Sequence, residues 1–282
     1  MKIRCFVFCF LFFVSCFAQG DNIIKSRSLI NFETHLVPSS FDFVVQHRFG
    51  KIEKENIIDD FFGTDLAGNI SFGFTKPLKN DDCLDLFRYK KNKVISFGYK
   101  KSLMIESSSF PVNLSFYASV GVKTGTLPVF SDNAFFEDLE TPFEYKFSHR
   151  VDYAYQLILS KNLSEKVYVQ LNPGFVYKNL IDLEKESRHY VFCPVSFYYK
   201  YSFSSAFVFE YGFFEKRFLS DYYETSSFPL SLGFEWGTAG HIFQVFVSNN
   251  QNIRTQELFV DFYEHQRPGF SFGFNIKRSW WF

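Results

Sequence analysis

Residues 268–277 read Pro-Gly-Phe-Ser-Phe-Gly-Phe-Asn-Ile-Lys, and this stretch decides the fold that we predict for the whole chain. Its apolar residues alternate with small or polar ones, so Phe270, Phe272 and Phe274 share one face of an extended strand. The other face carries small and mostly uncharged side chains, which suit a crowded, hydrated interior. A strand with these two faces is typical of a bacterial outer-membrane β-barrel, in which the aromatic face meets lipid.

The same alternation recurs along most of the chain. It predicts twelve strands, at residues 41–49, 68–76, 83–89, 93–102, 112–123, 144–160, 166–178, 188–201, 203–215, 226–237, 240–249 and 268–277. Most of them approach the length of about 9–11 residues that a tilted strand needs to cross a bilayer. We therefore predict an all-β fold, a single-chain antiparallel transmembrane β-barrel of about 12 strands within a range of about 10–14.

The lengths of the connections support this prediction independently. The links at 124–143, 179–187, 216–225 and 250–267 are long, and the links between them are short. Outer-membrane barrels combine long outer loops with short periplasmic turns. The alternation of long and short links predicts that the C-terminus lies in the periplasm. It also predicts that the 90–92 link is an outer loop, although this link is short.

Each predicted strand has a face that we assign to the lumen. The polar side chains assigned to it are Gln156, Gln170, Asn172, Glu235, Gln244, Ser248 and Asn275. A barrel of about twelve strands is wider than one that its own side chains fill and narrower than a large porin. The sequence is therefore compatible with both a small channel and a plugged interior. Aromatic residues near strand ends are assigned to interfacial girdles, namely Tyr198, Tyr199, Tyr201, Trp236, Trp280 and Trp281. The alternative, a soluble β-sandwich, would expose many Phe side chains to water and risk aggregation.

The N-terminus has the form of a secretory signal peptide. Residues 1–18 contain a short basic start, an almost continuous apolar run and a small-residue end, whereas a membrane helix would need a longer run. Lipidation at Cys16 is a competing interpretation. We assign residues 1–18 to the signal peptide, 19–40 to an N-terminal segment that forms a strand or a periplasmic extension, and 41–282 to the barrel.

Composition excludes some classes of function. The chain has 30 basic and 30 acidic residues, and the leader removes two basic ones (Lys2 and Arg4), which leaves 28 against 30. A nucleic-acid-binding protein would show a basic face, so no nucleic-acid partner is expected. Of the five cysteines, Cys83 and Cys193 lie outside the leader. A disulfide is permitted in this compartment, but we expect two free thiols that act as small apolar residues.

Several segments resemble one known family. They are Gln46–Gly50, Tyr155–Leu163, Val169–Pro173, Gly240–Val245, Ser248–Gln251, Thr255–Glu257 and Phe272–Arg278. They are similar to motifs of the DUF5777 β-barrel proteins of Bacteroidetes, and the similarity spans most of the chain after the leader. The resemblance implies an outer-membrane location and no particular activity. The chain departs from the pattern at Ser279–Trp281, which extends it and leaves the end of the last strand open.

The sequence carries no recognisable catalytic motif. Its six histidines lack metal-binding spacing, and it contains neither a phosphate-binding loop nor a G-x-S-x-G elbow. Ser148 and His149 are neighbours and would point to opposite faces of a strand. His241 could pair with Glu235 across a hairpin, without an evident nucleophile. We therefore expect no enzyme activity, no cofactor and no metal.

Three hypotheses for function follow. The first is a barrel that passes or binds a small solute, or that supports a periplasmic partner. The second is a structural barrel with a plugged lumen, and the third is a lipid-modifying enzyme of the outer membrane. The expected partners are outer-membrane lipid and, under the first hypothesis, the solute or the periplasmic partner.

Overall fold

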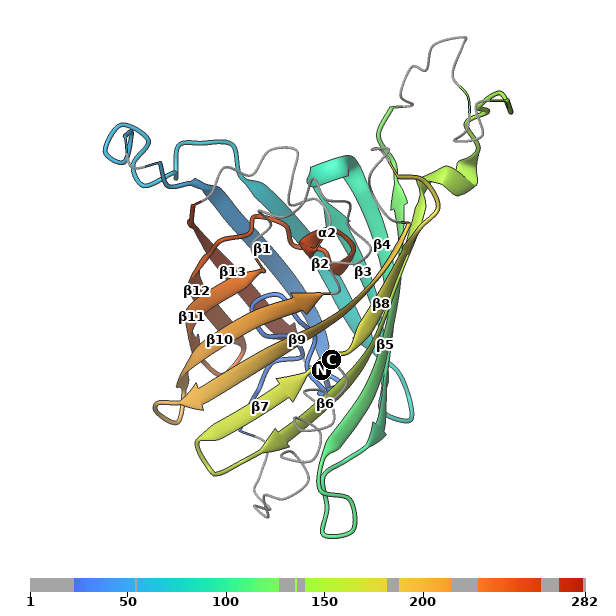
Figure 1. Ribbon diagram of the computed structural model, residues 1–282. Coiled ribbons are helices and arrows are strands. Elements are labelled where there is room, and N and C mark those ends of the chain that lie inside the picture. Colours follow the sequence, from blue (N-terminus) through green and yellow to red (C-terminus); the bar gives the residue numbers. More distant parts are fainter. Residues whose placement is uncertain are drawn as a thin grey trace, which may run out of the picture.

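The strands form one antiparallel sheet that closes into a barrel (Figure 1). The computed structural model describes residues 23–53, 55–126, 135, 140–181, 188–214, 228–259 and 269–280. Within these residues, β7 (Val167–Leu171) and β8 (Gly174–Lys178) both pair with β6 and β9, so together they occupy one position in the ring. The barrel is therefore a ring of twelve strands, as the sequence predicted.

Each predicted strand is present, with shifted ends. The other strands are β1 (Phe41–Lys51), β2 (Asn69–Pro77), β3 (Asp82–Tyr89), β4 (Val94–Met104), β5 (Asn113–Lys123), β6 (Val151–Asn162), β9 (His189–Lys200), β10 (Ser205–Phe214), β11 (Leu230–Gly237), β12 (His241–Ser248) and β13 (Ser271–Trp280). Residues 144–150 were predicted as strand, but 147–150 form the short 3-10 helix η2 (Phe147–Arg150). The last strand continues to Trp280 because Trp280 pairs with Phe41 where β13 meets β1 and the ring closes.

Side chains alternate between the two faces of the barrel as the sequence predicted. On β4, Phe97 is 53% exposed, whereas its neighbour Ser96 is 6% exposed and points inward. Closure of the ring satisfies the backbone hydrogen bonds that lipid cannot satisfy. Gly273 faces inward, where an added Cβ would overlap the ring of Phe246, so glycine is needed there for packing. In the described residues, no helix is long and apolar enough to span a membrane.

The predicted aromatic girdle is wrong at one residue. Tyr198 lies on the inner face of β9, 5% exposed, and its hydroxyl donates a hydrogen bond to Glu235 Oε1 at 3.0 Å. Tyr199 and Tyr201 are exposed on the outside, in agreement with the prediction. Trp281 and the signal peptide lie outside the described residues. Cys83 is a buried free thiol, as expected, and Cys193 is half-buried on β9.

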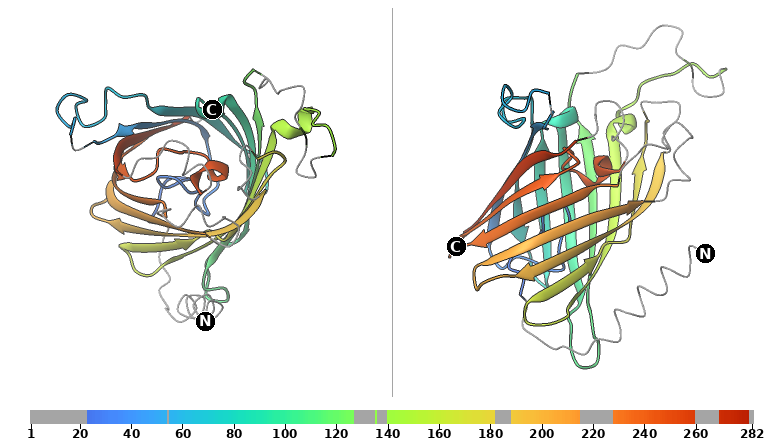
Figure 2. Two further views of the ribbon diagram at one scale, coloured as in Figure 1. Left: turned by 45° about the horizontal axis from the view of Figure 1, so that its top comes forward. Right: turned by 60° about the vertical axis from the view of Figure 1, so that its left-hand side comes forward.

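The interior of the ring is filled by the chain's own N-terminal part. Residues 23–40, here called the plug hairpin, run into the barrel and back to the start of β1 (Figure 2). Thr34 N–H donates to Arg27 O at 2.7 Å and Leu29 N–H to Phe32 O at 2.8 Å, so the hairpin turns at Ile30 and Asn31. The sequence predicted a strand or a periplasmic extension for residues 19–40, and the structure places residues 23–40 inside the ring.

A second segment enters the lumen from the end with the long loops. Residues 249–259, here called the inner loop, contain the short helix α2 (Thr255–Leu258) (Figure 1). The ring of Phe259 stacks on Phe192 with centroids 4.9 Å apart, and it contacts Phe32 of the plug hairpin with centroids 6.3 Å apart. The plug hairpin and the inner loop therefore meet inside the barrel.

Candidate functional site: the filled lumen

All seven side chains that the sequence assigned to the lumen are buried in the interior. They are Gln156, Gln170, Asn172, Glu235, Gln244, Ser248 and Asn275. Gln170 and Asn172 both donate to the backbone carbonyl of Glu33 on the plug hairpin, at 2.8 and 3.0 Å. Asn275 donates to Ile30 O at 3.0 Å and to Gln244 Oε1 at 2.7 Å.

The remaining members of this set connect wall strands to each other or to the inner loop. Gln244 donates to Glu235 at 2.6 Å, and Gln156 donates to Thr255 Oγ1 at 3.2 Å. The sequence raised a possible pair between His241 and Glu235, but His241 contacts Arg278 on the outside of the barrel. A role for the seven lumen residues in contacting a solute stays a prediction.

Four charged side chains form a network between the plug hairpin and the wall. The Arg27 guanidinium contacts Asp85 on β3 and Glu33 on its own hairpin. Lys100 of β4 pairs with Glu33 Oε2 at 2.6 Å. Lys100 also donates to the carbonyl oxygens of Arg27 at 2.9 Å and Thr34 at 3.1 Å. Two cations and two carboxylates thus neutralise each other where water has little access.

Burial and neighbouring charges shift the pKa values of Arg27 and Glu33 in opposite directions. Burial alone would raise the pKa of Glu33, but Arg27 and Lys100 together lower the pKa below its ordinary value. Burial alone would lower the pKa of Arg27, but the adjacent carboxylates of Asp85 and Glu33 raise the pKa well above its ordinary value. The charged forms are therefore the stable forms while the hairpin lies in the lumen.

A second set of polar contacts joins the tip of the hairpin to two separate strands of the wall. Asn31 donates to Glu210 on β10 at 2.8 Å through its side chain and at 3.0 Å through its backbone. The Asn31 amide oxygen accepts from Arg48 on β1 at 3.1 Å. Arg48 also lies 4.3 Å from the centroid of the Phe246 ring. Asn31 thereby links a buried cation and a buried carboxylate that lie on different strands.

His35 connects the returning half of the hairpin to the wall. Its Nδ1 lies 2.8 Å from Ser160 Oγ on β6 and 3.2 Å from the Tyr168 hydroxyl on β7. Burial, together with the positive charge of Lys100, lowers the pKa of His35 to about 3. The imidazole is therefore neutral in the closed barrel at physiological pH.

The inner loop is fixed to the wall by its own ion pairs. Arg254 contacts Asp152 on β6 and lies 3.1 Å from Glu257 within the loop. These carboxylates raise the pKa of Arg254 although burial opposes this. A Cβ at Gly121 of β5 would overlap both the Arg254 guanidinium and the Asp152 carboxylate. Glycine at position 121 therefore makes room for this pair.

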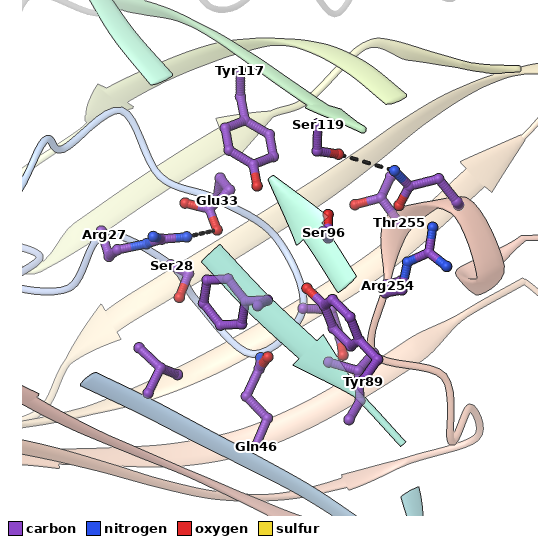
Figure 3. Close-up of a pocket in the computed structure, with 15 residues that line it drawn as sticks. Arg27, Ser28, Glu33, Gln46, Tyr89, Ser96, Tyr117, Ser119, Arg254 and Thr255 are labelled. Carbon is purple, nitrogen blue, oxygen red and sulfur yellow. Dashed lines mark hydrogen bonds and ion pairs between the residues drawn. The ribbon is translucent and has the colours of Figure 1, made fainter. Parts of the chain in front are cut away.

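A small polar cavity of about 40 Å³ separates the plug hairpin from the inner loop. Figure 3 shows Arg27 and Glu33 on one side of it, Arg254 on the other, and the ring of Tyr117 above. A water molecule needs roughly 10–15 Å³ of such space, so the cavity has room for a few waters. It is not an open passage through the barrel. Among the described residues, no group of three or more His, Cys, Asp or Glu side chains could hold a metal ion.

The chain is an integral membrane protein of the bacterial outer membrane. A closed antiparallel ring with apolar side chains outside and polar side chains inside defines that class. The chain belongs to the DUF5777 family of membrane-bound β-barrel domains, because the model of this family matches residues 24–280. The match includes the plug hairpin as well as the barrel.

The likeness to one solved structure, the NanC porin, supports the fold. The NanC porin superimposes with a TM-score of 0.52 at 7% sequence identity, over 86% of this chain and 100% of the porin. The KdgM porin gives a TM-score of 0.48 at 9% identity, over 86% and 99% of the two chains. An outer membrane channel from Pseudomonas putida F1 gives 0.47 at 11% identity, over 94% and 100%. No curated protein matches the sequence.

Proposed function

We propose that this protein is a small-solute channel of the outer membrane that the plug hairpin holds closed. The observation that carries the proposal is the nature of the contact between hairpin and wall. Arg27, Glu33 and Asn31 meet the wall through ion pairs and hydrogen bonds. Water can replace such contacts when the hairpin leaves, whereas an exposed apolar wall would resist hydration.

The wall supports the same proposal. Its charged and polar side chains that contact the hairpin come from strands all around the ring, including Asp85, Lys100, Glu210 and Lys277. A ring of twelve strands encloses more space than its own side chains fill, so release of the hairpin would leave a polar passage. The likeness to the NanC porin concerns the fold alone, and the proposal depends on the interior.

A structural barrel with a permanently plugged lumen is the second candidate. Apolar packing favours it, because Leu29, Ile30 and Phe32 of the hairpin are fully buried against wall and inner-loop side chains. Support for a periplasmic partner also remains a proposal. The hairpin supports it by its position, because Lys25 contacts Phe203 in a short turn, at the end of the ring that we assign to the periplasm.

Conductance separates a gated channel from a permanent plug. We define the open variant as Arg27→Ala combined with Glu33→Ala, which removes the hairpin's side of the charge network and leaves the wall intact. In planar bilayers, the channel proposal predicts rare openings for the unchanged protein and frequent stepwise current for the open variant. A folded open variant without current would support the permanent plug. Heat-modifiable gel mobility verifies that each variant is folded.

A further inference from the structure

The plug hairpin presents three kinds of chemical group to the wall. These groups are the guanidinium of Arg27, the carboxylate of Glu33 and the backbone carbonyl of Glu33. Each group has its own wall partners, and each set of partners is a potential binding site once the hairpin leaves. The chemistry of these partners indicates which solutes the wall can recognise.

The first site binds a cation. Arg27 contacts Asp85 and the hydroxyl of Thr75, and its guanidinium carbon lies 5.5 Å from the centroid of the Phe87 ring. Thr75 donates to Asp85 at 2.7 Å, so the hydroxyl and carboxylate are already positioned together. A carboxylate beside an aromatic ring is a recurring arrangement for ammonium and guanidinium groups.

The second site binds a carboxylate. The Lys100 ammonium is fully buried and pairs with Glu33 Oε2 at 2.6 Å. The third site binds a peptide carbonyl, because Gln170 and Asn172 both direct their amide N–H groups at Glu33 O. These donors come from strands on different parts of the ring and converge on one residue of the hairpin.

The cation and carboxylate sites are adjacent. Arg27 and Glu33 each contact their own wall partner and also contact one another (Figure 3). On the wall, Asp85 pairs in register with Gly98, and Lys100 lies two residues further along β4, so the two charged side chains are diagonal neighbours on the inner face. A solute that fits both sites must carry opposite charges close together.

Resting on the channel function proposed above, we infer that the plug hairpin imitates the solute. The released lumen then binds small zwitterions, namely free amino acids and short peptides. Their ammonium group would contact Asp85, Thr75 and Phe87, their carboxylate would contact Lys100, and a peptide carbonyl would accept from Gln170 and Asn172. An uncharged solute of equal size would offer no charged group to Asp85 or to Lys100, so the wall would favour the zwitterion over it.

Swelling of proteoliposomes in the open variant tests this inference. The probes are diglycine, which is a zwitterion, and N-acetylglycinamide, an uncharged molecule of similar size. Diglycine should enter about fivefold faster than N-acetylglycinamide, because one ion pair in a hydrated lumen contributes up to about 1 kcal/mol. On the open background, Asp85→Asn and Lys100→Gln should each remove this preference. Asp82→Asn is the matched control, because Asp82 is a carboxylate on the same strand as Asp85 whose partners are Lys101 and Tyr99, outside the three sites.

Block of ionic current provides a second readout that does not depend on the wall variants folding well. Added diglycine should reduce the current of the open variant, and N-acetylglycinamide should not. Equal entry of the two probes with no selective block would overturn the inference while leaving the channel function intact. A folded open variant that passes neither ions nor either probe would overturn the proposed function, and the inference with it.

Discussion

Replacement of Arg27 by alanine should shift the barrel from its closed to its open state. In the closed state the substitution leaves Asp85, which is 4% exposed, with the Thr75 hydroxyl as its remaining contact, whereas Glu33 keeps Lys100. Removal of one partner from a buried ion pair costs about 3–5 kcal/mol. Asp85 becomes hydrated when the hairpin leaves, so most of this cost falls on the closed state. The lower figure changes the ratio of closed to open molecules by about 100-fold.

The open probability of single channels in planar bilayers measures this shift. Two companion variants isolate its cause. Asp85→Asn added to Arg27→Ala removes the unpaired charge and should return the open probability toward that of the unchanged protein. Lys25→Ala alters an exposed hairpin residue that contacts Phe203 outside the charge network, and it should have little effect. An Arg27→Ala variant that gates like the unchanged protein would contradict this effect of the buried charge, and so would further opening when Asp85→Asn is added.

Three further predictions follow from the same geometry. The pKa of His35 is lower in the closed barrel, at about 3, than its ordinary value of 6.5, so protonation favours the released hairpin. The preference for neutral His35 stabilises the closed state in full above pH 6.5, and about 2 kcal/mol of this stabilisation is lost by pH 5. The open probability should therefore rise as the pH falls from 6.5 to 5, and His35→Gln should flatten this pH profile. Gly121→Ala should crowd Arg254 and Asp152, weaken the attachment of the inner loop by about 1–3 kcal/mol, and increase the current of the open variant. Leu232 faces outward on β11, and Leu232→Arg should lower the free energy of unfolding in lipid by about 2–4 kcal/mol, measured by urea titration; an unchanged value would contradict the assigned lipid face.

The strands and their faces could be predicted from the sequence because they depend on local alternation. Residues 268–277 show this, since Phe272 and Phe274 are exposed or half-buried outside while Ser271 and Asn275 are buried within. Tyr198 was misassigned because it lies among other aromatics near a strand end. Its position in the alternation, opposite to that of Tyr199, would have placed it inside.

The closure of the lumen could not be predicted in this way. Residues 23–40 carry no strand period, and the wall partners of Arg27 lie 48 and 58 residues away along the chain. The fold of the whole ring brings these partners to Arg27, so no local pattern reveals the contact. Asp85 was missed on the lumen face because its neighbours there, Cys83 and Phe87, are apolar and concealed the polar character of that face.

A reversible crosslink between the plug hairpin and the wall tests the central claim most directly. Asn31 and Ser231 are suitable positions, since their side chains lie 2.9 Å apart across the hairpin and β11. Both would be replaced by cysteine in the open variant, with Cys83 and Cys193 changed to alanine, and joined by a short cleavable methanethiosulfonate reagent. We expect stepwise current before crosslinking, no current after it, and recovery of the current on reduction. The same current in the crosslinked and reduced states would show that the hairpin does not close the barrel.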